Sequence, residues 1–86
     1  MSEVDVFKAL GDSTRLKILD LVKDQERCIC EIIPHTGKSQ PTISQHLRIL
    51  RNARLIKERK EGTNVWISAA NNQIYNIIQN IRGMNE

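Results

Sequence analysis

The most informative pattern in the sequence lies at residues 39–51, which read SQPTISQHLRILR. Ser39 is a typical N-cap residue, and Pro41 is tolerated in a first helical turn, so a helix is expected to begin at about residue 39. Apolar residues recur there at helical spacing and predict one buried stripe, formed by Ile43, Leu47 and Leu50. The remaining side chains are mostly polar and predict a hydrated face on the same helix.

A short helix and a tight turn precede this segment. Residues 29–35 predict a helix that stays short or irregular, because Pro34 lies inside it and lacks a backbone N–H. Residues 36–38 then form the turn, with Gly37 at its centre. Two helices joined by a short glycine-containing turn are typical of a helix-turn-helix, whose second helix enters the major groove of DNA.

The segments before this unit predict two further helices. Residues 4–10 read as a short helix that ends at Gly11, and Asp12 or Ser13 then caps a second helix. Residues 24–27 are expected to be a polar connection to the helix-turn-helix.

The segments after it predict a hairpin and a last helix. Two strand-like runs joined by a turn at residues 60–64 indicate a hairpin, or wing, over about residues 55–68. A final helix is expected over residues 71–82, with a wide apolar face formed by Ile74, Ile77, Ile78 and Ile81. The expected fold is mostly α with a small β-hairpin: one winged helix-turn-helix domain over residues 1–86, with about five helices and a two-stranded wing.

Positive charge is concentrated in the middle of the chain. The 86 residues carry a net charge of +3, but residues 38–60 alone carry seven bases and one acid. The net charge is −2 over residues 1–37 and −1 over residues 61–86. A basic region in so small a domain is the expected electrostatic signature of nucleic-acid binding, with a solvated charged face as the alternative. The order of the elements favours DNA.

The polar residues of the helix and of the wing tip are the candidate DNA contacts. Hydroxyl and amide groups can donate and accept at base edges, whereas arginines can reach phosphates. The candidates are Ser39, Gln40, Thr42, Ser44, Gln45, His46, Arg48 and Arg51 on the helix, and Lys60, Thr63 and Asn64 on the wing. Arg54 could also reach a phosphate. His46 has a structural alternative, because a histidine beside a buried stripe often hydrogen-bonds within the fold.

Cys28 and Cys30 form a Cys-x-Cys pair and are the candidate metal ligands. On a regular helix this spacing separates the side chains by roughly 200°, but in an extended backbone they lie on the same side. Chelation therefore requires non-helical backbone at the start of the third helix, which suggests that ion binding unwinds its first turn. Thiolates select soft ions such as As(III), Sb(III), Cd(II), Hg(II) and Zn(II). Two alternatives stay open: oxidation of the pair, and two small buried apolar residues.

The sequence favours a cytoplasmic protein without catalytic chemistry. Its first residues are acidic rather than basic, unlike a signal peptide, and no apolar run approaches the ~20 residues of a membrane span. No triad or carboxylate pair indicates an enzyme. No cofactor is expected for DNA binding itself. An interaction module that binds protein instead of DNA remains an alternative.

Four motifs, which together span most of the chain, resemble the ArsR/SmtB family of metal-sensing repressors. Residues 7–19 are similar to the opening of that family, and residues 27–32, RCICEI, resemble its thiol motif. Residues 39–50 are similar to its recognition helix, and Gly62 with residues 65–67 matches its wing.

The resemblance implies a homodimeric repressor whose first and last helices pair across the dimer axis. It also implies an inverted-repeat operator, from which metal or metalloid binding releases the protein. The chain departs from the family in two places. It has no third cysteine for As(III) or Cd(II), so His35, Glu31, water or a small thiol would have to complete the site. Its last helix lacks the Asp and His ligands of the family's zinc site.

Overall fold

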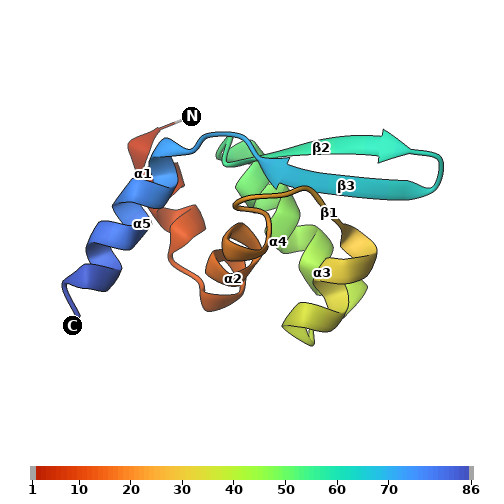
Figure 1. Cartoon of the computed structure of the whole chain (residues 1–86), viewed down its shortest axis with the longest axis horizontal. Helices are drawn as coiled ribbons and strands as arrows, with labels where there is room; N and C mark the ends of the chain where they lie inside the picture. Colours follow the sequence, from red (N-terminus) through yellow and green to blue (C-terminus); the bar gives the residue numbers. More distant parts are fainter. Residues whose placement is uncertain (1, 86) are drawn as a thin grey trace.

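The chain folds into five helices and three strands over residues 2–85, the part that this computed structural model describes (Figure 1). The elements are α1 Glu3–Leu10, α2 Ser13–Leu21, β1 Arg27–Cys28, α3 Ile29–Thr36, α4 Gln40–Asn52, β2 Ile56–Glu61, β3 Asn64–Ala69 and α5 Gln73–Gly83. This architecture confirms the expected fold class, a mainly helical winged helix-turn-helix.

Local signals in the sequence set where the helices begin and end. The Asp12 carboxylate caps α2 by accepting a hydrogen bond from the backbone N of Arg15 at 3.0 Å. Gly37 ends α3 with a φ of 69°, a left-handed conformation that glycine adopts without Cβ strain. Ser39 caps α4, where its hydroxyl accepts from the backbone N of Thr42 at 3.4 Å. The predicted turn between α3 and α4 is therefore present.

The strands form one antiparallel sheet in the order β1-β3-β2. β2 and β3 are the hairpin that was predicted as the wing. β1 lies where a polar connection over residues 24–27 was expected, and its Cys28 pairs in register with Trp66 of β3. The sheet therefore has one strand more than the predicted wing, and this strand joins the wing to the start of α3.

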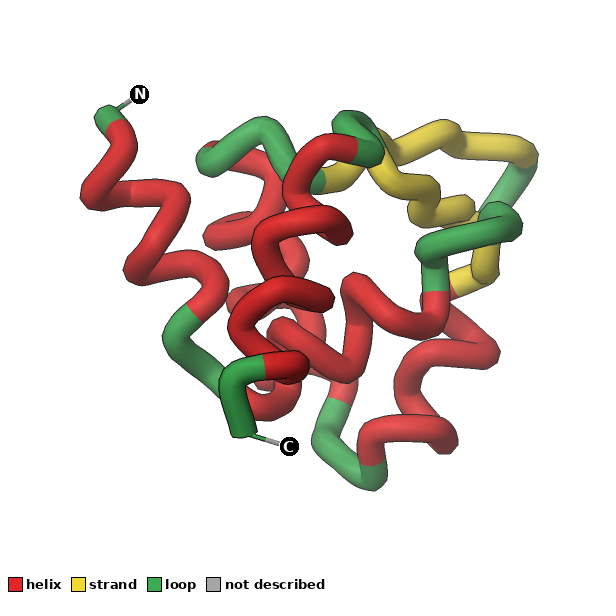
Figure 2. The backbone as a smooth tube through the Cα atoms, turned by 60° about the vertical axis from the view of Figure 1, so that its left-hand side comes forward, coloured by secondary structure: helices red, strands yellow, loops and turns green. Residues whose placement is uncertain are grey.

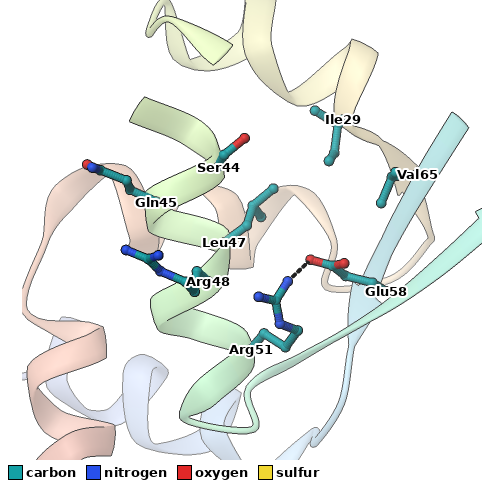
Figure 3. Close-up of a pocket in the computed structure, with 8 residues that line it drawn as sticks. All are labelled: Ile29, Ser44, Gln45, Leu47, Arg48, Arg51, Glu58 and Val65. Atoms are coloured by element: carbon teal, nitrogen blue, oxygen red, sulfur yellow. Dashed lines mark hydrogen bonds and ion pairs between the residues drawn. The ribbon is translucent and has the colours of Figure 1, made fainter. Parts of the chain in front are cut away.

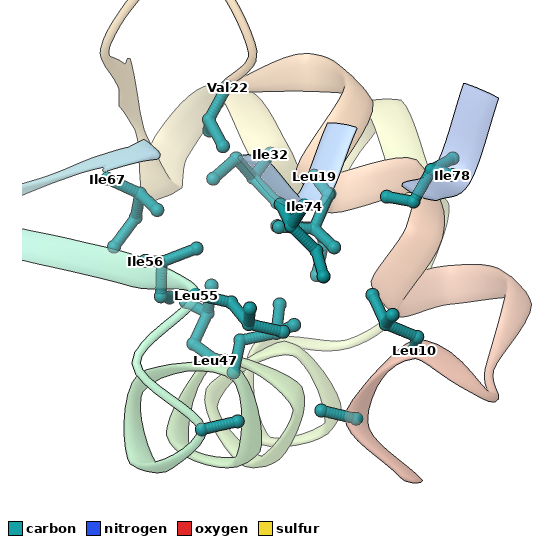
Figure 4. Close-up of a cluster of buried hydrophobic side chains, with 14 of the residues drawn as sticks. Leu10, Leu19, Val22, Ile32, Leu47, Leu55, Ile56, Ile67, Ile74 and Ile78 are labelled. Atoms are coloured by element: carbon teal, nitrogen blue, oxygen red, sulfur yellow. The ribbon is translucent and has the colours of Figure 1, made fainter. Parts of the chain in front are cut away.

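One apolar core lies between the helices and the sheet (Figure 4). α4 contributes the predicted stripe, of which Ile43 and Leu50 are fully buried and Leu47 is 2% exposed. The stripe packs in a cluster with residues from the other elements, including Ile18, Leu19, Ile32, Leu55, Ile56, Ile67, Ile74 and Ile78. Burying one such aliphatic side chain contributes about 1.5–3 kcal/mol, so the core holds α4 in one rotational setting.

α1 and α5 lie at the end of the molecule opposite the wing tip (Figure 1). The sheet lies on the side of the helical body away from α1 (Figure 2). The apolar face predicted for the last helix divides in two: Ile74 and Ile78 are buried, whereas Ile77 is 43% and Ile81 50% exposed. No helix among the described residues is long and apolar enough to cross a lipid bilayer.

Candidate functional site

The open face of α4 is the first part of the candidate site. Ser44, Gln45 and Arg48 lie off the buried stripe, and all three are exposed. Figure 3 shows Gln45 and Arg48 extending away from the wing. Because the core fixes the rotation of α4, these side chains are presented outward on a rigid element.

A hollow of about 350 Å³ lies between α4, the wing and the start of α3 (Figure 3). Leu47 and Val65 contribute apolar lining, whereas Arg48, Arg51 and Glu58 contribute charged groups. Arg51 donates a hydrogen bond to the Glu58 carboxylate of β2, and its side chain remains 45% exposed. This ion pair joins the C-terminal half of α4 to the wing.

The first turn of α4 carries three of the candidate DNA contacts. Ser39 and Gln40 are exposed, and Thr42 is half-buried. The Ser39 hydroxyl donates to Oγ1 of Thr42 at 3.0 Å in addition to capping the helix. Part of the hydrogen-bonding capacity of Ser39 and Thr42 is therefore used within the fold.

His46 is turned toward α1 and α2. Its side chain is 17% exposed, and its Nδ1 lies 3.1 Å from Nη1 of Arg15 and 3.8 Å from Oδ2 of Asp12. The same guanidinium donates to the carbonyl oxygens of Lys8 and Ala9 at the end of α1, at 3.1 and 2.7 Å. Arg15 has only donors, so Nδ1 of His46 is the acceptor in this contact. The geometry supports the structural role of His46 better than a contact with DNA.

The wing tip carries the remaining candidates. Lys60, Thr63 and Asn64 are all exposed at the end of the hairpin. Gly62 makes the turn with a φ of 61°, a conformation that side chains with a Cβ rarely adopt. The tip therefore presents one cation and two polar side chains beyond the helices.

Arg59 belongs to the wing, but its guanidinium is paired with acidic side chains of the same protomer. It donates to the Glu26 carboxylate at 2.7 and 3.1 Å and to Glu61 at 2.7 Å. Its guanidinium also lies over the ring of Trp66, 5.7 Å from the centroid. The hydrogen bonds from Arg59 hold the pKa of the Glu26 carboxyl below its usual value, and they raise the pKa of Arg59 in turn. These contacts fasten the wing to the loop before β1.

Cys28 and Cys30 lie where β1 passes into α3. Cys28 has extended backbone, with φ −70° and ψ 146°, and acts as the N-cap residue, whereas Cys30 lies in the first helical turn. The two residues form a disulfide, with Cys28 3% exposed and Cys30 exposed. The backbone is thus non-helical at Cys28, whereas Cys30 is already part of α3. That ion binding to the reduced pair unwinds the first turn of α3 stays a prediction.

The other donors near the pair are few. A hollow of about 400 Å³ beside Cys30 is also lined by Glu31, Pro34 and His35. The Glu31 carboxylate is already engaged, since it accepts from the backbone N of Cys28 at 3.2 Å and pairs with Arg27 at 3.4 Å. Within residues 2–85 no three His, Cys, Asp or Glu side chains are gathered as a metal site. When reduced, the pair would offer two thiolate sulfurs, and His35 lies with Cys30 along the same hollow.

Exposed apolar side chains lie on both terminal helices. Val4 and Phe7 of α1 are 54% and 60% exposed, and Ile77 and Ile81 of α5 are 43% and 50% exposed. Exposed apolar surface of this kind is typical of a protein–protein contact.

Comparison with known proteins identifies the family. Residues 12–58 match the family described as "Bacterial regulatory protein, arsR family". The chain belongs to the ArsR family. It is 53% identical to an uncharacterised HTH-type transcriptional regulator of Methanocaldococcus jannaschii. The aligned 60 residues cover 69% of this chain and 67% of the relative. This ArsR-family member is also 39% identical to the arsenical resistance operon repressor of Staphylococcus aureus. The aligned 80 residues cover 93% of this chain and 77% of the repressor.

Structural similarity supports the same assignment. The ArsR-family chain superimposes with a TM-score of 0.84 on a homodimeric winged helix-turn-helix DNA-binding domain of Mycobacterium bovis, at 30% identity over 95% of this chain and 79% of that one. It is therefore a transcriptional regulator with a winged helix-turn-helix DNA-binding domain, and not an enzyme. DNA binding and homodimer formation are typical of this family, which argues against an interaction module without DNA affinity.

Two polar contacts in the ArsR-family chain were not predicted from the sequence. They join Arg15 to His46, 31 residues apart, and Arg59 to Glu26, 33 residues apart. The sequence shows an acid, Glu26, two residues before Cys28 and a base, Arg59, in the wing. No local pattern in the sequence indicates that these two residues form a pair.

Proposed function

We propose that this protein is a dimeric repressor that binds an inverted-repeat operator through α4 and the wing and leaves it when a thiophilic metal or metalloid ion binds Cys28 and Cys30. The observation that carries the proposal is the open polar face of α4, with Gln45 and Arg48 exposed, beside the wing (Figure 3). A helix anchored on one side and polar on the other is what a recognition helix presents to the major groove.

The candidate residues divide by chemistry. Amide and hydroxyl groups suit base edges, and these are Gln40, Gln45, Ser39, Thr42 and Ser44. Arg48 and Arg51 suit phosphates, and Lys60, Thr63 and Asn64 at the wing tip suit the adjacent backbone or minor groove. His46 supports α4 from behind through Arg15.

A dimer would cover the exposed apolar residues of the terminal helices. We propose that residues 1–86 form a single domain. Val4, Phe7, Ile77 and Ile81 would then pack against the same helices of a second copy, because a two-fold axis brings the same surface of both copies together. Two-fold symmetry matches an inverted-repeat operator whose half-sites lie on one face of the duplex. A cytoplasmic location is part of the same proposal.

The donor set of the thiol pair fits soft ions. Hg(II) accepts two thiolates, whereas As(III) and Sb(III) require a third donor, which His35, water or a small thiol would supply. Cd(II) and Zn(II) require more than two donors as well. Bound there, such an ion would supply a fixed bridge between the two sulfurs.

An ion bound between the two sulfurs would change the position of α4 through α3. Cys28 and Cys30 begin α3, and α3 is joined to α4 by a short turn at Gly37, so a shift of α3 changes the position of α4. By linkage, ion binding and operator binding weaken one another by the same factor.

A titration of the protein's own promoter fragment tests the proposal. The reduced protein should bind the fragment, and at least one of As(III), Sb(III), Cd(II), Hg(II) and Zn(II) should release it in the presence of a phosphine reductant. The double substitution Cys28→Ser and Cys30→Ser should keep DNA binding and lose the response. The proposal fails if no ion changes the affinity, or if the serine variant responds as the wild type does.

A redox switch on the same pair is the second candidate, because Cys28 and Cys30 form a disulfide in the structure. Forming this bond removes two electrons and two protons from the thiols, which a two-electron oxidant such as diamide takes up. Release by diamide, without release by any ion under reductant, would favour this candidate over metal sensing.

A further inference from the structure

One row of residues crosses all three strands of the sheet. Trp66 of β3 pairs in register with Cys28 of β1 on one side and with Arg59 of β2 on the other. Residues that pair directly in an antiparallel sheet place their side chains on the same face. A single indole therefore lies between the buried cysteine and the base that holds the wing.

Arg59 fastens this row to the loop that leads into the thiol pair. Glu26 accepts two hydrogen bonds from Arg59, at 2.7 and 3.1 Å, and lies two residues before Cys28. The same guanidinium covers the Trp66 ring. Arg59 thus contacts the middle strand and the entry to β1 from its place in the wing.

The indole of Trp66 has an unmet hydrogen bond. Its Nε1 is buried and has no acceptor among residues 2–85. A buried N–H without a partner costs free energy, so a shift of a neighbouring strand that offers an acceptor is favoured. The middle of the row therefore carries an unsatisfied donor, whose surroundings a shift of β1 against β3 would change.

We propose that the row formed by Cys28, Trp66 and Arg59 transmits the chemical state of the thiol pair to the wing. A change in the bonding of the Cys28 sulfur moves β1 against β3, and the Arg59–Glu26 contact carries the hairpin with the loop. The wing then responds in addition to α4, and Arg59 is a positioning residue for it. This inference rests on the proposed function, in which the thiol pair is the sensor.

Phenylarsine oxide is a suitable probe for the experiment. Its arsenic forms bonds to two thiol sulfurs, keeps its phenyl carbon as the third substituent and releases one water, so no further donor from the protein is needed. The reduced protein is titrated with promoter DNA in the presence and absence of this compound. The readout is the ratio of the two dissociation constants.

The variant Arg59→Gln tests the row, and Lys57→Gln is its matched control, because it removes the same charge from the same strand. The wild-type ratio should be about tenfold, within the usual range of allosteric coupling, and Arg59→Gln should reduce it to about threefold or less. Lys57→Gln should keep the wild-type ratio. A wild-type ratio in Arg59→Gln overturns the inference while leaving the proposed function intact. No response in the wild type overturns the proposed function, and the inference with it.

Fluorescence supplies a second readout, because Trp66 is the one tryptophan of the chain. The compound should change the emission of the wild type and of Arg59→Gln, but not that of Cys28→Ser. This result separates loss of transmission from loss of binding. An unchanged emission in the wild type, at a concentration that releases DNA, overturns the inference. Thermal unfolding of Arg59→Gln should match the wild type closely, since exposed ion pairs contribute little stability.

Discussion

Replacing Arg48 with glutamine should flatten the salt dependence of operator binding. Arg48 is exposed on the open face of α4, and Arg51 and Lys60 are the other cations on the proposed interface. If each neutralises one phosphate, a dimer engages about six, and the logarithm of the binding constant should fall with the logarithm of salt concentration with a slope of about −5. The substitution removes two of these contacts, so the slope should change to about −4.

The assay is fluorescence anisotropy of a labelled promoter fragment over about 0.1 to 0.4 M salt, where the affinity change is large. Arg54→Gln is the matched control. Arg54 carries the same charge just beyond α4, but it lines a different hollow, together with Lys8 and Asp5 of α1. It should leave the slope unchanged. An unchanged slope in Arg48→Gln, or an equal change in both variants, would refute the assignment, because net charge rather than position would then control binding.

Three further outcomes are expected. Tyr75→Phe removes a 2.6 Å hydrogen bond from the phenol to the Leu19 carbonyl, and urea unfolding should show a loss of about 1 kcal/mol. Burial raises the pKa of Tyr75 from 10.0 to about 12, so the contribution of Tyr75 to stability should be complete below pH 10 and be lost as pH rises toward 12, a loss that Tyr75→Phe should lack. Ile81→Glu should yield monomers in sedimentation and weaken operator binding, whereas Gln79→Glu on the same helix should stay dimeric; a dimeric Ile81→Glu would exclude α5 from the interface. Leu47→Ala, at a position 2% exposed, should cost about 2–5 kcal/mol in the same urea assay, and a smaller loss would contradict the anchoring of α4.

The elements that could be predicted from the sequence are those with local causes. The start of α4 follows from Ser39 and Pro41, and its buried face follows from apolar spacing, so both agree with the structure. Gly37 and Gly62 occupy turns with positive φ, where glycine is the favoured residue. These signals depend only on residues a few positions apart.

The elements that could not be predicted depend on distant partners. β1 has two residues, too few for any periodicity, and it exists as a strand because β3 pairs with it. His46 reads as a polar residue on a recognition helix until Arg15 is placed beside it. Arg59 reads as one more base of the wing until Glu26 is placed beside it. Charge counting locates the basic region but does not show which bases are already paired.

The cysteine pair falls between these two cases. Its spacing correctly requires extended backbone at Cys28, and the structure has it. The spacing alone does not show that this backbone belongs to a sheet, or that Cys28 pairs with Trp66 of the wing.

Arg15 holds α1 and α4 of one protomer in a fixed relative position, so the protomer acts as a rigid arm between them. Its guanidinium donates to the last carbonyls of α1 and contacts His46 of α4, so it spans from the proposed two-fold axis to the base-reading helix. Two such arms meet a duplex that repeats every ~10.5 base pairs, so one base pair added between the half-sites rotates one of them by roughly 34° around the helix axis. An arm that does not bend cannot follow this rotation. The stiffness of the protein would then restrict binding to operators with the correct spacing between half-sites, even where the base sequence of each half-site is unchanged.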